Sequence, residues 1–310
     1  GFRPQTQSGV PGRLVPTYSP GLPIVMAALR WLFGPNAVFL AVPALAGLTV
    51  WLMFVLGRDF AGRGAGLFAA AWLATSPAFV NSSLIPMSDV PVTAWWLAAF
   101  VPALRTGPGL AALAGSATSL AVLTRPNLAP LGVIVALPYI RRWLRHRNRA
   151  HSLDLGIFSL TAAIGPAVVG WLFNYWYGSP FLSGYGSNTS LFSWWFVPAN
   201  LARYPRWLIE SQTPVILLGL AAPFLLRRAG HVAGRPPRVA LARLMLVFAA
   251  LVWACYLSYL VFDDWWYLRF LLPSYPMLVA LASAALLIVL RRTPAPRSFA
   301  AALLAVLVAH

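Results

Sequence analysis

The sequence contains no lysine and very few acidic residues. All 23 basic residues are Arg, only six residues are Asp or Glu, and charged residues make up 9% of the 310 positions. Soluble domains carry about 25% charged residues. Because so little charge cannot cover a water-soluble globule of this size, the composition excludes an ordinary soluble domain.

Cysteine is almost absent as well. The lone Cys255 lies within an apolar run, so the chain has no disulfide framework, and this thiol is expected to pack as a small hydrophobic side chain. No signal peptide precedes the apolar runs, and the chain starts at Gly1. The last apolar run, 298–310, is shorter than the roughly 20 residues of a membrane span. We therefore expect a fragment, cut at both ends, of a single transmembrane domain that covers residues 1–310.

Apolar residues dominate the chain. Hydrophobic residues occupy 60% of the positions, the mean hydropathy is +0.73, and apolar runs recur from end to end. This pattern predicts an all-α, polytopic integral membrane protein with about ten transmembrane helices. A shorter stretch, GLPIVMAALRWLFG, predicts an external interfacial helix at the end of the first external loop, 1–36. The predicted spans are 37–56, 65–85, 91–104, 109–124, 127–140, 153–175, 213–226, 244–262, 270–290 and 298–310.

The placement of charge predicts the topology. If residues 1–35 are external and the loops alternate, 16 of the 23 Arg fall on the opposite side, which the positive-inside rule makes cytoplasmic. The loops 141–152 and 227–243 are then cytoplasmic, and 176–212 is external. Short Arg clusters between apolar runs are typical of topology-setting charge and not of a nucleic-acid groove, so we expect no nucleic-acid partner. Four acids fall on the external side: Asp89, Glu210, Asp263 and Asp264.

Two external turns carry isolated charges. Asp89, in SLIPMSDVPVTAWW, lies where one span ends and the next begins. It either caps a helix or serves as a functional carboxylate at the membrane edge. Arg125, in LAVLTRPNLAPL, lies in a very short turn on the side where positive charge is disfavoured. It either snorkels to the interface or binds phosphate, and we favour phosphate.

Two other external stretches are rich in aromatic residues. YWYGSPFLSGYGSNTS, which includes Tyr185, is either a turn under an aromatic belt or a loop that lines a sugar site. FDDWWYLRFLLPSYP, which includes Asp263, Asp264 and Arg269, is either a set of interfacial anchors or a phosphate site. In the second case Arg269 holds the phosphate and an acid orients it or binds an acceptor, so we expect one of the two acids to pair with Arg269. Guanidiniums, carboxylates and aromatic faces together suit a substrate that bears phosphate or sugar.

Five motifs in order resemble a known family. They are VPTYSPGLPIVMAALRWLFGP, GRDFAGRGAGLFAAAWLATSPAFVNSSLIPMSDVP, LTRPN, YGSPFLSGYG and YLRFLLPSYP. The set resembles the bacterial type C (GT-C) glycosyltransferases, akin to protein O-mannosyltransferases and the aminoarabinose transferases that act on lipid A. The resemblance implies transfer of a sugar from a polyprenyl-phosphate donor to a lipid, glycan or protein acceptor, on the external side of the bacterial inner membrane.

The resemblance also implies roles for individual residues. Asp89 corresponds to the family's acid after the third span and is the catalytic candidate. Arg125 corresponds to the basic residue of the family's LT(R/K) turn, and Arg269 corresponds to the Arg before its LP…P span, beside which the lipid phosphate is expected. The family's principal catalytic base follows the first span, which is expected upstream of Gly1. The substrate-binding candidates are Arg125, Arg269, Asp263, Asp264, Tyr18 and Tyr185.

Two points stay open from the residues alone. External carboxylates could hold a divalent cation, but no spacing requires one, so no metal ligand or cofactor is assigned. A membrane transporter or flippase for a lipid-linked or phosphate-bearing substrate is the competing function. That class favours mid-span charges and an internal repeat, neither of which the sequence shows. A non-catalytic membrane scaffold is a third alternative.

Overall fold

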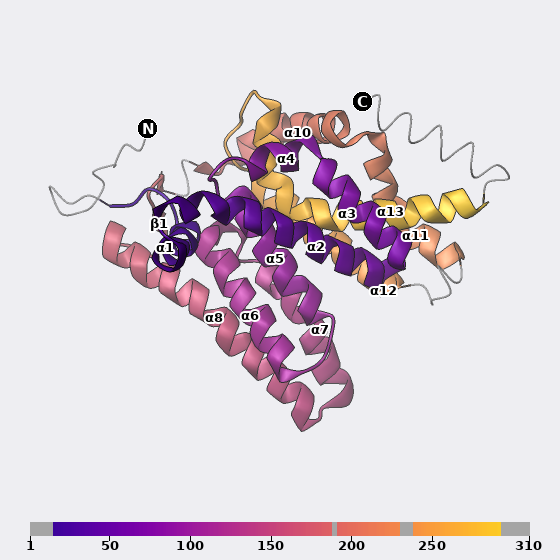
Figure 1. Ribbon diagram of the computed structural model, residues 1–310, viewed down its shortest axis with the longest axis horizontal. Coiled ribbons are helices and arrows are strands. Elements are labelled where there is room, and N and C mark those ends of the chain that lie inside the picture. The colour runs from indigo at the N-terminus through magenta and orange to yellow at the C-terminus, as the bar shows by residue number, and fades with distance from the viewer. Residues whose placement is uncertain (1–14, 188–190, 230–237, 293–310) are drawn as a thin grey trace.

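The computed structural model describes residues 15–187, 191–229 and 238–292, and nearly all of these residues are helical (Figure 1). The helices of the first half are α1 (Gly21–Phe33), η1 (Pro35–Leu40), α2 (Ala41–Ala61), α3 (Arg63–Thr75), α4 (Pro77–Ser83), α5 (Asp89–Ala103), α6 (Pro108–Thr124), η2 (Pro126–Leu128), α7 (Leu131–His146) and α8 (Arg149–Tyr177). A small hairpin follows, of β1 (Leu182–Ser183) and β2 (Gly186–Ser187). The second half then contains η3 (Trp194–Phe196), α10 (Val197–Gln212), η4 (Pro214–Leu217), α11 (Leu218–Ala229), α12 (Val239–Leu257), η5 (Trp265–Ser274) and α13 (Tyr275–Arg292).

The helices differ in their capacity to cross a membrane. Within the described residues, four segments are long and apolar enough: Pro35–Ala61, Arg149–Tyr177, Val239–Leu257 and Trp265–Leu290. The pair Trp194–Gln212 and Pro214–Arg228 makes a fifth if it counts as one span bent by 115°. Other apolar helices are shorter than the roughly 20 residues of a full crossing; α5 and α6 have 15 and 17 residues. The predicted spans therefore correspond to helices of different lengths, of which only some can cross a membrane alone. The predicted span 298–310 lies outside the described residues.

The prediction of one span over 65–85 is wrong. The chain breaks there into α3 and α4, with Ser76 extended at φ −62° and ψ 122° between them. Proline has no N–H to donate and disfavours helical geometry in the residue before it, so Pro77 ends α3 and starts a new helix. A similar break separates α10 from η4, where Thr213 adopts φ 64° directly before Pro214.

Close helix packing explains how short elements form one bundle. The helix α6 packs more extensively against α8 than against any other helix, and a Cβ on Gly165 would lie only 2.5–2.6 Å from the backbone of Ser119. The Ser119 hydroxyl donates to the Thr161 carbonyl at 2.6 Å and accepts from the Gly165 N–H at 2.8 Å. Small residues with hydrogen bonds between helices are the usual means of association in lipid. These contacts hold α8 along α6.

The bundle has a buried centre and a projecting arm. Along Trp265–Leu290, 89% of the apolar window is buried, whereas the figure for Arg149–Tyr177 is 17%. In Figure 1, α6, α7 and α8 project downward from the layer that contains α2, α3 and α13. At the left of Figure 1, α1 leaves Trp31 85% exposed, as an interfacial helix would.

Candidate active site

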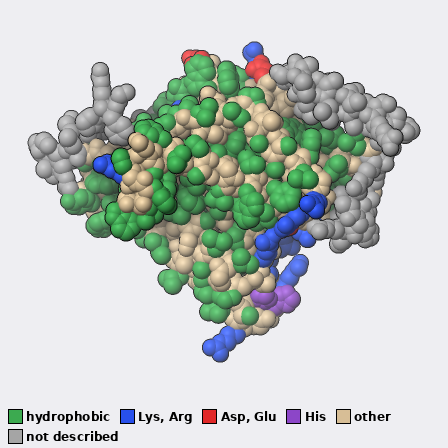
Figure 2. All heavy atoms as spheres, viewed as in Figure 1, with side chains coloured by type: hydrophobic (Ala, Val, Ile, Leu, Met, Phe, Trp, Pro, Cys, Tyr) green, Lys and Arg blue, Asp and Glu red, His purple; other side chains and the backbone are tan. Residues whose placement is uncertain are grey.

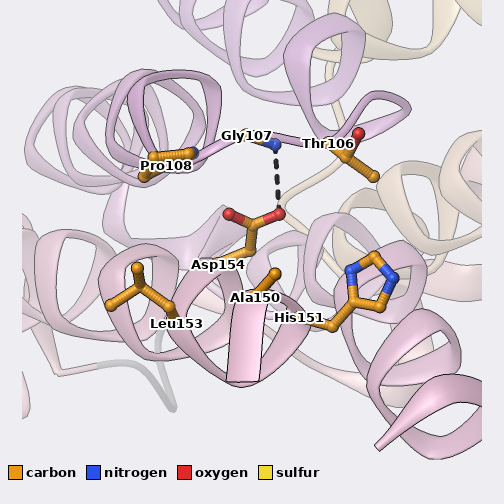
Figure 3. Close-up of a pocket in the computed structure, with 7 residues that line it drawn as sticks. All are labelled: Thr106, Gly107, Pro108, Ala150, His151, Leu153 and Asp154. Carbon is orange, nitrogen blue, oxygen red and sulfur yellow. Dashed lines mark hydrogen bonds between the residues drawn. The ribbon is translucent and has the colours of Figure 1, made fainter. Parts of the chain in front are cut away.

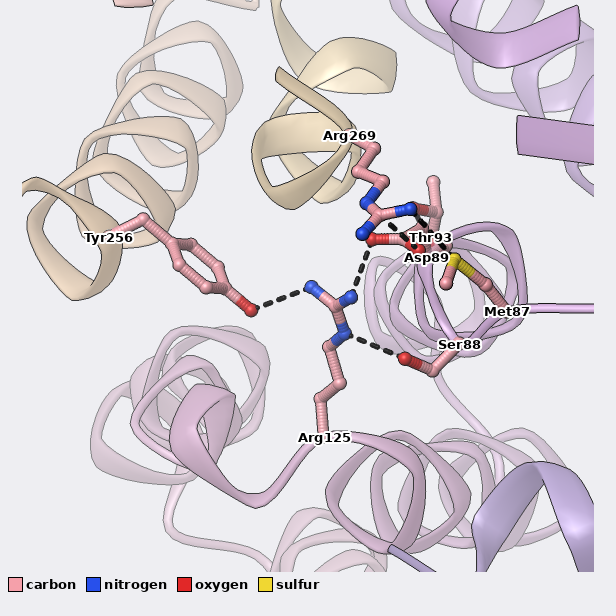
Figure 4. Close-up of polar contacts among 7 residues, drawn as sticks. All are labelled: Met87, Ser88, Asp89, Thr93, Arg125, Tyr256 and Arg269. Atoms are coloured by element: carbon pink, nitrogen blue, oxygen red, sulfur yellow. Dashed lines mark hydrogen bonds and ion pairs between the residues drawn. The ribbon is translucent and has the colours of Figure 1, made fainter. Parts of the chain in front are cut away.

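Four segments that are distant in sequence converge on one cluster of polar side chains (Figure 4). They are the turn between α4 and α5, the end of α6, the end of α12, and η5. Asp89 is the first residue of α5, where the helix dipole favours a carboxylate. Arg125 is extended at φ −143° because Pro126 follows it, which ends α6. Arg269 lies on η5, a ten-residue 3-10 helix, and 3-10 runs of this length are uncommon.

Arg125 uses all three of its nitrogens within this cluster. Its Nη2 lies 2.5 Å from Asp89 Oδ1, its Nη1 donates to the Tyr256 hydroxyl at 2.9 Å, and its Nε donates to Ser88 Oγ at 3.0 Å. The side chains of Asp89 and Arg125 are only 1% and 12% exposed. A buried carboxylate needs such a partner, because its desolvation would otherwise be very costly.

Arg269 approaches the same carboxylate but is far less satisfied. Its Nε lies 4.0 Å from Asp89 Oδ2 and is buried without a hydrogen-bond partner among the described residues. Its Nη1 donates to the sulfur of Met87, and a thioether is a weak acceptor. Arg269 therefore keeps strong donor capacity that the protein itself does not use.

A single aromatic ring supports both guanidiniums. The Cζ atoms of Arg125 and Arg269 lie 5.2 and 5.5 Å from the centre of the Phe270 ring. The Tyr256 ring stacks on Phe270 at 5.4 Å and 9°. Cation–π contacts of this kind stabilise guanidiniums in a partly desolvated site.

The charge balance of the cluster indicates its ligand. Two guanidiniums share one carboxylate, so a net positive charge remains in a largely buried site. Such an arrangement can bind an anion, and phosphate is the anion that guanidinium forks match best. No group of three or more His, Cys, Asp or Glu in the described part of the chain could hold a metal ion.

The structure places the two predicted tyrosines together and within electrostatic reach of this cluster. Tyr18 and Tyr185 meet edge to face, with ring centres 5.9 Å apart. Partial burial and the neighbouring Tyr18 and Tyr259 raise the pKa of Tyr185, whereas Arg125 lowers it. The Tyr185 phenol is therefore protonated at neutral pH and can donate a hydrogen bond.

The expected pairing of Arg269 with Asp263 or Asp264 is wrong. Asp263 is 86% exposed and forms a salt bridge with Arg203 of α10 at 2.8 Å. Asp264 is exposed where η5 begins. No salt bridge joins Arg269 to either acid within the described residues, because η5 turns its Arg inward to Asp89 and leaves the two acids at the surface.

Sequence reasoning missed four members of the cluster: Met87, Ser88, Tyr256 and Phe270. The first two immediately precede Asp89, and Phe270 immediately follows Arg269, so their closeness to candidate residues is a signal that was available. Tyr256 gave no signal, because it lies near the end of an apolar span, where an aromatic residue usually anchors the membrane interface.

Comparisons with known proteins agree with this fold. A family model described as the N-terminal part of the oligosaccharyl transferase STT3 matches residues 10–105. The crystal structure of ArnT from Cupriavidus metallidurans bound to undecaprenyl phosphate is similar over 94% of this chain, with a TM-score of 0.58 and 16% identity. The apo state of the same ArnT is similar over 93%, with a TM-score of 0.57 and 17% identity. Among curated proteins, none matches this sequence.

These findings define the fold of the protein. The chain has a polytopic, all-α membrane fold similar to that of ArnT, and residues 10–105 are similar to the N-terminal part of STT3, so the predicted resemblance agrees with both comparisons. The chain spans about half the length of ArnT, 52% in both structures. The activity and substrates of the whole protein are therefore a matter for proposal.

Proposed function

We propose that the full-length protein transfers a sugar from a polyprenyl-phosphate donor to a lipid, glycan or protein acceptor. The observation that carries this proposal is the pair of guanidiniums, Arg125 and Arg269, converging on Asp89 with a net positive charge. The fold that holds them is similar to that of ArnT, which has been crystallised with undecaprenyl phosphate. An anionic lipid phosphate is therefore the ligand that fits both the cluster and the fold.

Each charged residue of the cluster has a distinct role in this proposal. Arg269 binds the lipid phosphate, because its Nε is buried without a protein partner. As the sugar leaves, negative charge grows on the phosphate, and a fixed guanidinium stabilises that charge. Asp89 and Arg125 are positioning residues: their ion pair fixes one guanidinium, and the second oxygen of Asp89 orients the other.

The remaining chemistry requires a proton acceptor. An acceptor hydroxyl that attacks the anomeric carbon must lose its proton, which a carboxylate can take. Asp89 is only 1% exposed and is held by Arg125, so we assign it to positioning and assign the proton to a different carboxylate of the full-length protein. Tyr18 and Tyr185 are assigned to the sugar, because aromatic faces pack against sugar rings and the Tyr185 phenol can donate.

The site is assigned to the external side of the bacterial inner membrane. Figure 2 shows histidine and a run of basic side chains along the lower right of the molecule, whereas acidic side chains lie at the top. Cytoplasmic loops carry an excess of Arg, which supports a cytoplasmic lower end. The transporter or flippase alternative gains no support from the family model or from the solved structures.

The test uses the full-length protein, a defined polyprenyl-phosphate sugar and measured transfer. Arg269→Ala should lower kcat/KM for the donor by about tenfold or more, since it removes a charge-assisted contact. Arg269→Lys should have a kcat/KM between those of the wild type and Arg269→Ala, because an ammonium keeps the charge but cannot form the bidentate contact. Arg206→Gln, at an exposed salt bridge on α10, is the matched control and should leave transfer unchanged. Full activity of Arg269→Ala would contradict the assignment.

A further inference from the structure

A pocket that contains one carboxylate lies at the other end of α6, about 25 Å from Arg125 along a 17-residue helix. It is a pocket of about 260 Å³ lined by residues 106–108 of the α5–α6 turn and by the first turns of α8 (Figure 3). The wall from α8 is formed by Ala150, His151, Leu153 and Asp154. None of these residues belongs to the candidate active site.

Asp154 is the unusual group of this pocket. Its side chain is buried at 4% exposure, and its Oδ2 accepts the Gly107 N–H at 3.1 Å, as Figure 3 shows. Its Oδ1 accepts no hydrogen bond from any described residue, and no described cation forms a salt bridge with it. By contrast, Asp59 at the same end pairs with Arg58 and Arg105. An ionisable group buried at a membrane edge without a partner is a candidate binding group.

The surroundings of Asp154 carry the opposite charge. Arg149 is exposed directly before Ala150, and the half-buried Arg142 lies within electrostatic reach of Asp154. The Arg142 Nη2 donates to the Ala103 carbonyl at 3.0 Å, and its Nε is buried without a hydrogen-bond partner among the described residues, so Arg142 contributes mainly its charge. A simple cation would be repelled by this basic rim, and a simple anion would be repelled by the carboxylate. A zwitterion that carries an ammonium a few ångströms from a phosphate satisfies both charges.

Apolar surface beside the pocket distinguishes a lipid from a soluble zwitterion. Leu153, which lines the pocket, is 54% exposed. The end of α7, which leads into α8, also carries exposed apolar side chains: Leu144 is 52% exposed and Trp143 is 38% exposed. Exposed apolar side chains next to Arg residues are typical of a membrane interface. Acyl chains could cover these side chains while the headgroup enters the pocket.

We propose that this pocket binds a phospholipid whose headgroup carries a primary amine. The ammonium donates to Asp154 Oδ1, the phosphate contacts the exposed Arg149 within the field of Arg142, and the acyl chains lie over Leu153. A primary ammonium has three N–H donors, whereas a choline headgroup has none and cannot replace it. Asp154 then has two roles: its Oδ2 caps the first turn of α6 through the Gly107 N–H, and its Oδ1 binds the ammonium.

The experiment measures lipid binding to the purified chain by native mass spectrometry. Phosphatidylethanolamine, phosphatidylcholine and phosphatidylglycerol with identical acyl chains are titrated separately. We expect ethanolamine lipid to bind about tenfold or more tightly than choline lipid, as loss of one charge-assisted hydrogen bond implies. Glycerol lipid should also bind more weakly, because it lacks the amine. Soluble O-phosphoethanolamine should fail to displace the lipid.

Two variants separate binding from structure. Asp154→Asn keeps an oxygen for the Gly107 N–H but loses the charge, and it should abolish the preference for ethanolamine lipid. Ala150→Leu fills the pocket but keeps the Asp154 carboxylate, and it should also abolish the preference for ethanolamine lipid. This second variant tests the pocket if Asp154→Asn folds poorly. Glu210→Gln, an exposed acid elsewhere, should retain the preference.

Several results would overturn the proposal. Equal affinity of the wild-type chain for ethanolamine and choline lipids would reduce the pocket to an ordinary lipid contact. Equal or tighter binding of phosphatidylglycerol would assign the affinity to the basic rim alone. A preference that survives in both pocket variants would remove Asp154 from the site, and displacement by O-phosphoethanolamine at similar affinity would replace the lipid with a soluble ligand.

Discussion

A buried carboxylate lies near each end of α6: Asp89 of α5 at one end and Asp154 of α8 at the other. The two carboxylates have different hydrogen-bond and ion-pair partners. Asp89 faces two guanidiniums, one at 2.5 Å and one at 4.0 Å. Asp154 accepts one backbone N–H and has no salt-bridge partner within the described residues. The first cluster has a surplus of positive charge and suits an anion, whereas the second leaves a negative group that suits a cation. Burial alone therefore does not define a site; the charge left over after pairing does.

The two ends of α6 are predicted to face opposite sides of the membrane, and thiol labelling tests this. In a Cys255→Ser background, Asn148→Cys, near Asp154, should be labelled by an impermeant thiol reagent only from the cytoplasmic side. Arg206→Cys, at the other end, should be labelled only from outside. The expected difference is all-or-none, because a charged reagent does not cross the bilayer. External labelling at position 148 would overturn the topology and the side assigned to the active site.

Removal of Arg125 should produce the largest change in stability. Arg125→Ala leaves Asp89 buried without its closest partner, and breaking a buried ion pair in this way costs about 3–5 kcal/mol. Thermal unfolding in detergent would measure it. Arg149→Ala, which removes an exposed Arg at the other end of the bundle, serves as the control and should melt like the wild type. A melting temperature of Arg125→Ala close to the wild type would mean that the ion pair contributes little.

Thermal unfolding of Asp154 variants should show that removing the charge alone does not destabilise the protein. Asp154→Ala leaves the Gly107 N–H without its acceptor, at a cost of about 1–3 kcal/mol. Asp154→Asn retains an acceptor and removes an unpaired buried charge, so it should unfold at the wild-type temperature or above. If Asn destabilises as much as Ala, Asp154 has an ion-pair partner after all.

Asp89→Asn should have a smaller effect, seen in function more than in folding. The amide can still accept a hydrogen bond from Arg125, but Arg269 loses the carboxylate that orients it. In the full-length protein we expect the KM for the lipid-linked donor to rise by about tenfold, the effect of one charge-assisted contact, with expression nearly unchanged. A purely structural role would instead lower expression and leave the KM of the folded enzyme unaltered.

Much of the candidate site could be predicted from the sequence. Asp89, Arg125 and Arg269 each lie at a boundary between apolar runs that parity assigns to one side, so their meeting follows from topology. The pairing of Arg269 could not be predicted, because a pairing depends on how far a helix is rotated. The 3-10 geometry of η5 turns Arg269 toward Asp89 and leaves Asp263 to Arg203.

The sequence predicted the fold class, but it did not predict the positions at which helices break. Hydropathy identifies apolar runs, yet it does not register that Pro77 divides one run into α3 and α4. Nor does it register the sharp bend at Thr213, which depends on a positive φ at a residue other than glycine. The pocket beside Asp154 was missed because it forms between the α5–α6 turn and α8, which meet only in the folded chain.

The central claim is that Arg269 binds a lipid phosphate, and binding of undecaprenyl phosphate to the purified chain tests it most directly. The wild-type chain should bind this lipid and should not bind undecaprenol, which has the same chain without the phosphate. Arg269→Ala should weaken binding by about tenfold or more, while Arg206→Gln should leave it unchanged. Equal binding by the wild type and Arg269→Ala, or equal binding of the phosphate and the alcohol, would contradict the account.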